Sequence, residues 1–469
     1  MLAQNVASRA FSLVSQLVLA RLLLPADFGL IGLAYTVTSI AATLANIGIE
    51  DVLTQRQRGL RLWTGAAFWI ILGLASLSAL VVVAVSPIAA AAYKVPELVG
   101  LLAVAALAMP LGALASVPGM IMRARMQFGV LALYGSVELF AQALLTIVFA
   151  WAGAGAYSFV LPAPILAVAR AVIWWRLANS SVSLRPKRKR WKYVVSNTAA
   201  TFLSRTIITF INQGDYIVLG LVASQDVVGA YYFGFRLAAQ PLWLLAGNFS
   251  GVIFPALAQL KGDPQRQGDA ALKASNLLSF CVMPMAMLQA AAAAPLVASL
   301  FGDKWLSSIP IIQLLSIGLA FDAVSWIAGS LLNARGEFVA GLRYSLLQGP
   351  FFFLLVGVGA LLGQAIGVAW AVCAFYAISQ PLYVWAVYRR LGITGRQVAI
   401  IYLRPTVLAG TAVGLALLAS MLPWFSGHQL VRVLVIGVIG TVLYAALVRW
   451  LATEIWSELR DRAVGALRR

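Results

Sequence analysis

The chain has 469 residues, of which 62% are hydrophobic and only 10% are charged, and such a composition is incompatible with a water-soluble protein. The formal net charge of +19 would suit a nucleic-acid-binding protein, but the basic residues gather in short loops between apolar stretches, as the orienting charges of a membrane protein do. No segment has the length and polarity of a soluble domain, which excludes a soluble enzyme. The sequence therefore predicts an all-α polytopic membrane protein.

Taken in chain order, the apolar stretches predict about fourteen membrane-spanning helices, because each stretch is long enough to cross a bilayer. They lie roughly at 4–24, 28–48, 63–86, 97–118, 128–151, 156–177, 194–222, 227–257, 274–301, 309–333, 341–362, 365–389, 403–423 and 430–452. The domains that follow are a six-helix lobe at 1–178, a basic cytoplasmic linker at 179–193, a second six-helix lobe at 194–390, an appended helix pair at 403–452 and a basic amphipathic tail at 453–469.

The distribution of basic residues predicts the orientation of these spans. Most of the 34 lysines and arginines lie in loops that follow even-numbered spans or in the tail. The loops after odd-numbered spans contain only Arg21, Lys94, Lys304 and Arg432. By the positive-inside rule, both termini are expected in the cytoplasm.

The two lobes show an internal repeat. At an offset of 200 positions, the segment 16–29 aligns without a gap with the segment 216–229. Both contain the end of an apolar helix, a short turn with an acidic residue and a glycine that opens the next helix. Parallel repeats of this kind are common in transporters and predict two pseudo-symmetric lobes.

Polar faces repeat at the same offset. In the first span, Asn5, Arg9, Ser12 and Gln16 share one helix face, and the offset pairs them with Arg205, Thr209, Asn212 and Tyr216 of the seventh span. Arg236 follows in the eighth span. An arginine within a span costs about 2.5–3.5 kcal/mol on insertion scales, so these side chains are expected to face a water-filled cavity or a partner. A cationic lumen for an anionic substrate is one interpretation; snorkelling, or a buried ion pair with Asp215 or Asp322, is the other.

Three acidic residues within spans, Glu138, Asp215 and Asp322, are candidates for ion coupling by H⁺ or Na⁺, because an isolated carboxylate in a low dielectric binds a cation or a proton. Each could equally pair with an arginine, and Asp215 could be hydrated near the outer end of its helix. No catalytic residue, metal ligand set or resident cofactor is predicted, because the chain lacks the corresponding motifs and has one histidine, His428.

Several short motifs are familiar. The segment 20–29, Ala-Arg-Leu-Leu-Leu-Pro-Ala-Asp-Phe-Gly, resembles the first turn of Wzx-type polysaccharide exporters. The segments 229–237 and 254–257, together with Pro241, resemble the matching part of their second lobe, and the resemblance is greatest to exopolysaccharide exporters of the colanic-acid type. It implies the V-shaped fold of the multidrug/oligosaccharidyl-lipid/polysaccharide (MOP) superfamily, with two six-helix lobes around a central cavity and two extra C-terminal helices.

The resemblance further implies a flippase that moves undecaprenyl-diphosphate-linked oligosaccharides across the bacterial inner membrane by alternating access, for exopolysaccharide, capsule or O-antigen synthesis. Arg205, Arg236 and Arg9 would then bind the diphosphate, and the sugar contacts would come from Asn212, Gln213, Gln240, Asn248 and Gln16. Membrane lipids, a polysaccharide polymerase or co-polymerase and glycosyltransferases are the expected partners, and nucleic acid is not. The alternatives are a multidrug cation antiporter, a lipid II flippase and, from another class, a membrane polymerase or ligase of lipid-linked sugars.

Overall fold

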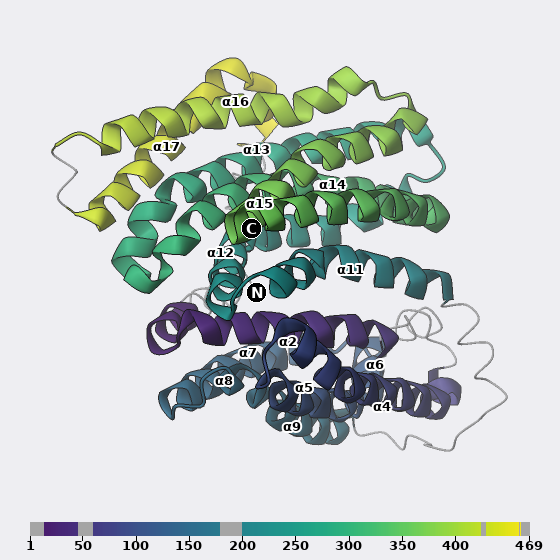
Figure 1. The fold of residues 1–469 in the computed structure, drawn as a ribbon. Helices are drawn as coiled ribbons and strands as arrows, with labels where there is room; N and C mark the ends of the chain where they lie inside the picture. The colour runs from purple at the N-terminus through teal and green to yellow at the C-terminus, as the bar shows by residue number, and fades with distance from the viewer. Residues whose placement is uncertain (1–13, 46–59, 179–198, 424–427, 459, 461–469) are drawn as a thin grey trace. The chain divides into compact units, whose positions relative to one another are not determined.

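The structure is a computed structural model that describes residues 14–45, 60–178, 199–423, 428–458 and 460 (Figure 1). The described residues form helices joined by short turns, and they contain no β-strand. This confirms the predicted all-α fold. Each of the fourteen predicted spans contains helical residues, including a described part of the first span at residues 14–22.

Nine helices of the described residues are long and apolar enough to cross a membrane, or ten when the bent pair α5 and α6 is taken as one span. This count is lower than the fourteen spans predicted from the sequence, and the reason is physical. The seventh and eighth spans, α11 and α12, carry the polar residues noted in the sequence and are not among the nine. The eleventh and twelfth spans are joined in one long helical element, so they are counted once. The fourteen-span prediction is consistent with these helices, and the orientation of the termini stays a prediction.

The chain divides into two compact units, Met1–Gly229 and Ala230–Arg469. The boundary falls within α12 and not at the basic linker, so the lobe boundaries expected from the order of the spans stay a prediction. The helices of the first unit are α2 (Pro25–Ala45), α4 (Leu60–Tyr93), α5 (Leu98–Ala113), α6 (Ser116–Ala124), α7 (Phe128–Trp151), α8 (Tyr157–Val160), α9 (Pro162–Ala178), α11 (Ala199–Val222) and the beginning of α12 (Gln225–Gln259).

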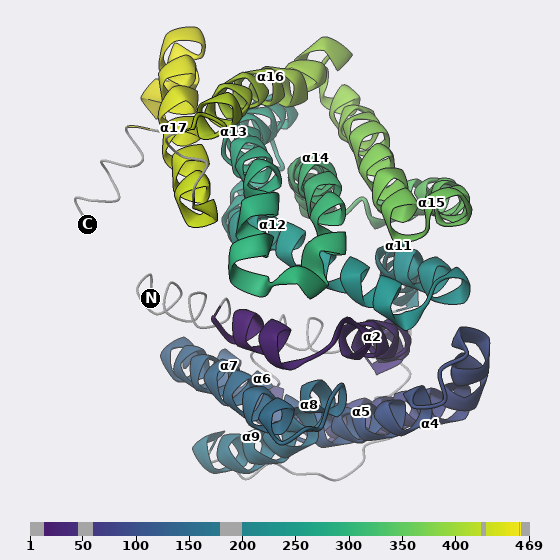
Figure 2. The same cartoon turned by 60° about the vertical axis from the view of Figure 1, so that its left-hand side comes forward.

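Within the first unit, α5 packs against α2, α4 and α9, as the lower half of Figure 2 shows. One of its cores joins α4 to the bent end of the fourth span, where Phe68 and Ile71 meet Val117 and Met120. The bend between α5 and α6 is 41°. The α7 helix also contacts α9, and this pair carries charged residues that are described below.

The second unit contains the rest of α12 and the helices α13 (Pro264–Leu296), α14 (Ile309–Arg335), α15 (Phe338–Tyr388), α16 (Gly395–Ser420) and α17 (Gln429–Leu451). A π-helical turn at Val297–Phe301 and a 3₁₀ turn at Asp303–Ser308 join α13 to α14. The appended pair α16 and α17 packs against α13 (Figure 2). Thr394 begins α16 with a capping box that it forms with Gln397.

The α15 element is two antiparallel helices. Its backbone is non-helical at Gly363 and Gln364, and φ of Gln364 is 46°. Beyond this break the chain runs back along itself, so that Tyr344 donates a hydrogen bond to the carbonyl of Ala386 over 3.2 Å. The element therefore supplies the two spans predicted at 341–362 and 365–389.

The internal repeat is visible in the backbone. Helix, bend and helix follow one another at residues 22–25 and again at residues 222–225, which is the predicted offset of 200. The two turns meet inside the first unit: a Cβ on Gly29 would collide with the carbonyl of Gln225, and a Cβ on Gly229 would collide with the carbonyl of Pro25. Because the partners of the two glycines also differ by 200, the contact is reciprocal, as a pseudo-two-fold relation requires.

Candidate functional site

The polar face of α11 belongs to the first unit. Arg205 and Asn212 are exposed on it, and Thr209 donates a hydrogen bond to the carbonyl of Arg205 over 2.9 Å. The helix positions these side chains at intervals of three or four residues, which places them on one side. The predicted polar face is thus present on the surface of this unit, where a guanidinium and an amide can reach a ligand.

A second group on α11 faces the interior of the same unit. Gln213 is half-buried, and its Oε1 accepts a hydrogen bond from the hydroxyl of Thr36 on α2 over 3.3 Å. Asp215 is 2% exposed, and its Oδ1 accepts a hydrogen bond from the backbone N–H of Tyr216. Of the alternatives for Asp215, hydration near the helix end is wrong, because its side chain is buried within the protein, and its role in ion coupling stays a prediction.

Arg236 lies on α12 within the second unit and is half-buried. Its Nη1 donates a hydrogen bond to the hydroxyl of Tyr232 over 3.3 Å, and its guanidinium carbon lies 5.7 Å from the centre of the same ring. One turn further along the helix, Gln240 is also half-buried. A cation that contacts a neutral phenol keeps its full charge, so Arg236 remains chemically suited to bind an anion.

The remaining predicted contacts are only partly described. Gln16 is half-buried in the first unit. Arg9 lies outside the described residues, and so does the side chain of Asn248. Since Arg205 and Arg236 belong to different compact units, the joint diphosphate site stays a prediction.

The other two predicted acids have different surroundings. Glu138 on α7 forms an ion pair with Arg170 on α9, with 3.4 Å between Oε1 and Nη1. Asp322 on α14 accepts hydrogen bonds from Trp326 Nε1 over 3.1 Å and from Ser325 Oγ over 3.4 Å. No arginine or lysine among the described residues pairs with Asp322.

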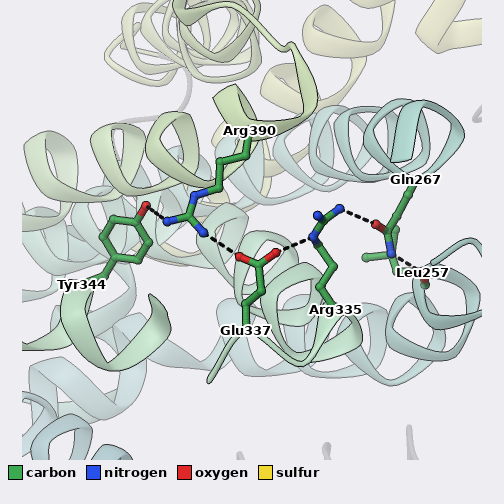
Figure 3. Close-up of polar contacts among 6 residues, drawn as sticks. All are labelled: Leu257, Gln267, Arg335, Glu337, Tyr344 and Arg390. Carbon is green, nitrogen blue, oxygen red and sulfur yellow. Dashed lines mark hydrogen bonds and ion pairs between the residues drawn. The ribbon is translucent and has the colours of Figure 1, made fainter. Parts of the chain in front are cut away.

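The second unit contains a polar network that no motif of the sequence predicts, centred on Glu337 (Figure 3). The carboxylate of Glu337, between α14 and α15, accepts one bond from Arg335 Nε and another from Arg390 Nη1, each over 2.6 Å. Arg390 also donates to the hydroxyl of Tyr344. The hydrogen bond from Arg335, together with the positive charge of both arginines, lowers the pKa of Glu337 below its usual value, so it is ionised at neutral pH.

The same network extends to a fully buried amide. Arg335 Nη1 donates to Gln267 Oε1 over 3.2 Å, and Gln267 Nε2 donates to the carbonyl of Leu257 over 2.8 Å. The network therefore joins the ends of α12, α13, α14 and α15. In the sequence Arg335 and Arg390 stand out only for their charge, and no local pattern shows that the residues of this network meet. Their donors and acceptors satisfy one another, which is typical of a stabilising role.

Metal chemistry finds no support in the described part of the chain. No group of three or more His, Cys, Asp or Glu side chains lies close enough there to hold a metal ion. The arrangement instead offers guanidinium, amide and carboxylate groups on membrane-spanning helices, which can bind polar parts of a cargo without forming or breaking covalent bonds.

Comparison with known proteins gives a consistent result. The profile of the family described as polysaccharide biosynthesis protein matches residues 18–310. The succinoglycan biosynthesis transport protein ExoT of Rhizobium meliloti is 24% identical over 95% of this chain and 90% of its own length. The lipopolysaccharide biosynthesis protein WzxC of Escherichia coli is 22% identical over 76% of this chain and 73% of its own.

Solved structures show the same fold. The lipid II flippase MurJ in an inward closed conformation has a TM-score of 0.76 at 13% identity, over 96% of this chain and 99% of that chain. An inward-facing multidrug resistance transporter of the MATE family has a TM-score of 0.64 at 14% identity, over 82% of this chain and 94% of that chain. The chain therefore has the helical fold of the MOP superfamily, as its motifs had predicted.

Proposed function

The chain belongs to the polysaccharide biosynthesis protein family, and from this membership we propose that it transports lipid-linked oligosaccharides across the bacterial inner membrane for the synthesis of an extracellular polysaccharide. It is a multi-pass membrane protein, and its relatives include a succinoglycan biosynthesis transport protein and a lipopolysaccharide biosynthesis protein. Similarity to the succinoglycan protein over nearly the whole of both chains is the observation that carries the proposal.

The chemistry of the cargo explains the polar helix faces. A diphosphate that bears a sugar chain cannot enter hydrocarbon unaided, because burying its charges and hydroxyls without partners costs too much free energy. Arginine is suited to the diphosphate since it stays charged and binds phosphate oxygens bidentately. In this proposal Arg205 and Arg236 bind the diphosphate, and Asn212 and Gln240 bind sugar hydroxyls. Gln213 is already engaged by Thr36 and contributes to the packing of α11 on α2 as well.

Movement between two leaflets requires alternating access, which the repeated halves of such folds perform by rocking. A coupling ion, H⁺ or Na⁺, would drive it. Of Glu138 and Asp322, Asp322 is the better candidate, because Glu138 has an arginine partner and Asp322 has only neutral donors among the described residues. We expect Asp322→Asn to lose ion-dependent transport and Asp322→Glu to keep part of it. If the two variants transport equally well, both with and without an ion gradient, ion coupling by Asp322 is excluded.

The decisive experiment is deletion of the gene, followed by analysis of the lipid-linked oligosaccharides in the inner leaflet. We expect one undecaprenyl-diphosphate-linked repeat unit to accumulate there, the polymer to disappear from the medium, and the wild-type gene to reverse both changes. A normal polymer level in the deletion strain would contradict the proposal.

Two alternatives of the same superfamily are each tested in a different strain. The fold likeness to the lipid II flippase makes that activity the second candidate, and it predicts that the chain rescues cells depleted of their own lipid II flippase. A multidrug antiporter would instead restore drug resistance to a pump-deficient strain. Glycosyltransferases and a polymerase or co-polymerase would be partners in supplying and consuming the cargo.

A further inference from the structure

A charged pair of the first unit lies far from either end of its helices. Glu138 on α7 and Arg170 on α9 are joined over 3.4 Å, and their side chains are 23% and 32% exposed. Arg170 is eight residues from the end of α9 at Ala178, which corresponds to about 12 Å along the helix axis. Such depth makes contact with acyl chains costly for groups that are still partly exposed. The pair therefore faces water or a polar ligand.

Two aromatic side chains complete this cluster. The guanidinium carbon of Arg170 lies 5.9 Å from the centre of the Trp174 ring, and Tyr134 meets the same ring edge-on at 5.6 Å. A glycine of α6, Gly119, lets the indole lie against the backbone there, since a Cβ would collide with it. We call Tyr134, Glu138, Arg170 and Trp174 the α7–α9 cluster.

The α7–α9 cluster holds more hydrogen-bond donors than the described residues satisfy. Arg170 Nε and Trp174 Nε1 are buried and have no acceptor among the described residues. The next residue provides a contrast, because Trp175 Nε1 donates to the carbonyl of Leu114 over 2.9 Å. Buried donors are usually paired, so these two, directly beside a partly exposed ion pair, mark a polar site for which the described residues do not supply all the acceptors.

We propose that the α7–α9 cluster is a binding subsite for a neutral sugar ring of the transported oligosaccharide. The carboxylate of Glu138 cancels the charge of Arg170 and would repel a phosphate, whereas adjacent sugar hydroxyls can donate to the carboxylate and accept from the guanidinium at once. The aromatic rings offer apolar surface to the C–H groups of the sugar. This inference rests on the proposed function and adds a second contact region, remote in sequence from the arginines assigned to the diphosphate.

A purely structural ion pair is the competing explanation, and one double variant separates the two. Replacing an ion pair by apolar residues of similar size is often neutral or stabilising, so Arg170→Met with Glu138→Leu should fold. The binding role predicts that its affinity for the released oligosaccharide repeat of the host's own exopolysaccharide, measured by isothermal titration calorimetry, falls about tenfold or more. Binding of inorganic pyrophosphate should stay unchanged. Arg176→Met, an exposed arginine on the same helix, is the matched control.

A pair of tryptophan variants provides a finer test. Trp174→Phe removes an N–H that has no acceptor among the described residues, and we expect weaker binding of the oligosaccharide with only a small fall in melting temperature, from the indole packing lost at Gly119. Trp175→Phe removes the N–H that binds Leu114, and we expect a lower melting temperature with unchanged binding. The reverse pattern would overturn the proposal.

The outcomes are distinguishable from those of the proposed function. If the double variant binds the oligosaccharide and exports it as well as the wild type, the subsite is excluded while the transport function stands. If the double variant loses pyrophosphate binding and keeps oligosaccharide binding, the assignment of a neutral sugar is wrong. If the deletion strain exports polymer normally, the transport function fails, and the titration alone decides whether the cluster binds sugar.

Discussion

Arginine and carboxamide side chains occur both on the polar face of α11 in the first unit and in the Glu337 network of the second unit. The two regions differ in how these side chains are arranged. Arg205 and Asn212 are exposed on one side of α11. Glu337 is held between Arg335 and Arg390, and its hydrogen bonds are as short as 2.6 Å. Side chains on an exposed helix face can contact a cargo, whereas a carboxylate held between two arginines contributes mainly to the stability of the fold. The two regions should therefore respond differently to mutation.

The largest effect is expected from the arginines assigned to the cargo. Arg205→Ala and Arg236→Ala should each lower polymer export by about 100-fold or more, because a charge-assisted bidentate contact with phosphate is lost. Arg205→Lys and Arg236→Lys should keep part of the activity, since the charge remains but the planar fork does not. Export is measured in the complemented deletion strain, with the membrane level of each variant determined by immunoblot.

Arg176→Ala is the control, because this exposed arginine at the end of α9 has no assigned contact with cargo. Wild-type export by both alanine variants at normal protein level would exclude Arg205 and Arg236 as contacts of the cargo.

The reciprocal turn contact offers the second test. Gly29→Ala and Gly229→Ala should each lower the stability of the protein by about 1–3 kcal/mol, because the new methyl group forces two backbones apart. The two effects should be similar, since each glycine meets the residue equivalent to the other's partner. Thermal unfolding in detergent measures them. Gly73→Ala on α4 is the control, because open space surrounds that position and alanine favours the helix. Unequal effects of the two variants would argue against a symmetric contact.

These regions also show what the sequence could and could not predict. The helix breaks near residues 24 and 224 and the face of α11 depend on neighbours within one or two turns, so composition and periodicity sufficed to place them. The partners of Glu337 lie on helix ends that are distant in the chain, such as Arg390 and Gln267, and no local pattern encodes such a meeting. For the same reason the sequence left both burial and hydration of Asp215 open, since the choice depends on tertiary packing.

The smallest effect is expected at Glu337, and on stability rather than on transport. Glu337→Gln weakens two charge-assisted hydrogen bonds that are partly exposed to solvent, so the free energy of unfolding should fall by about 1–2 kcal/mol. Export at a permissive temperature should stay near the wild-type level. The pH dependence follows from the lowered pKa of Glu337: its contribution is present above the pKa of the unfolded state, near 4.5, and is lost as the pH falls through the folded-state value below it. The difference in melting temperature between wild type and Glu337→Gln should therefore be full at pH 7 and vanish in acid. A variant that unfolds like the wild type at pH 7 but no longer exports polymer would place this network with the cargo contacts, and would reverse the contrast between the two regions.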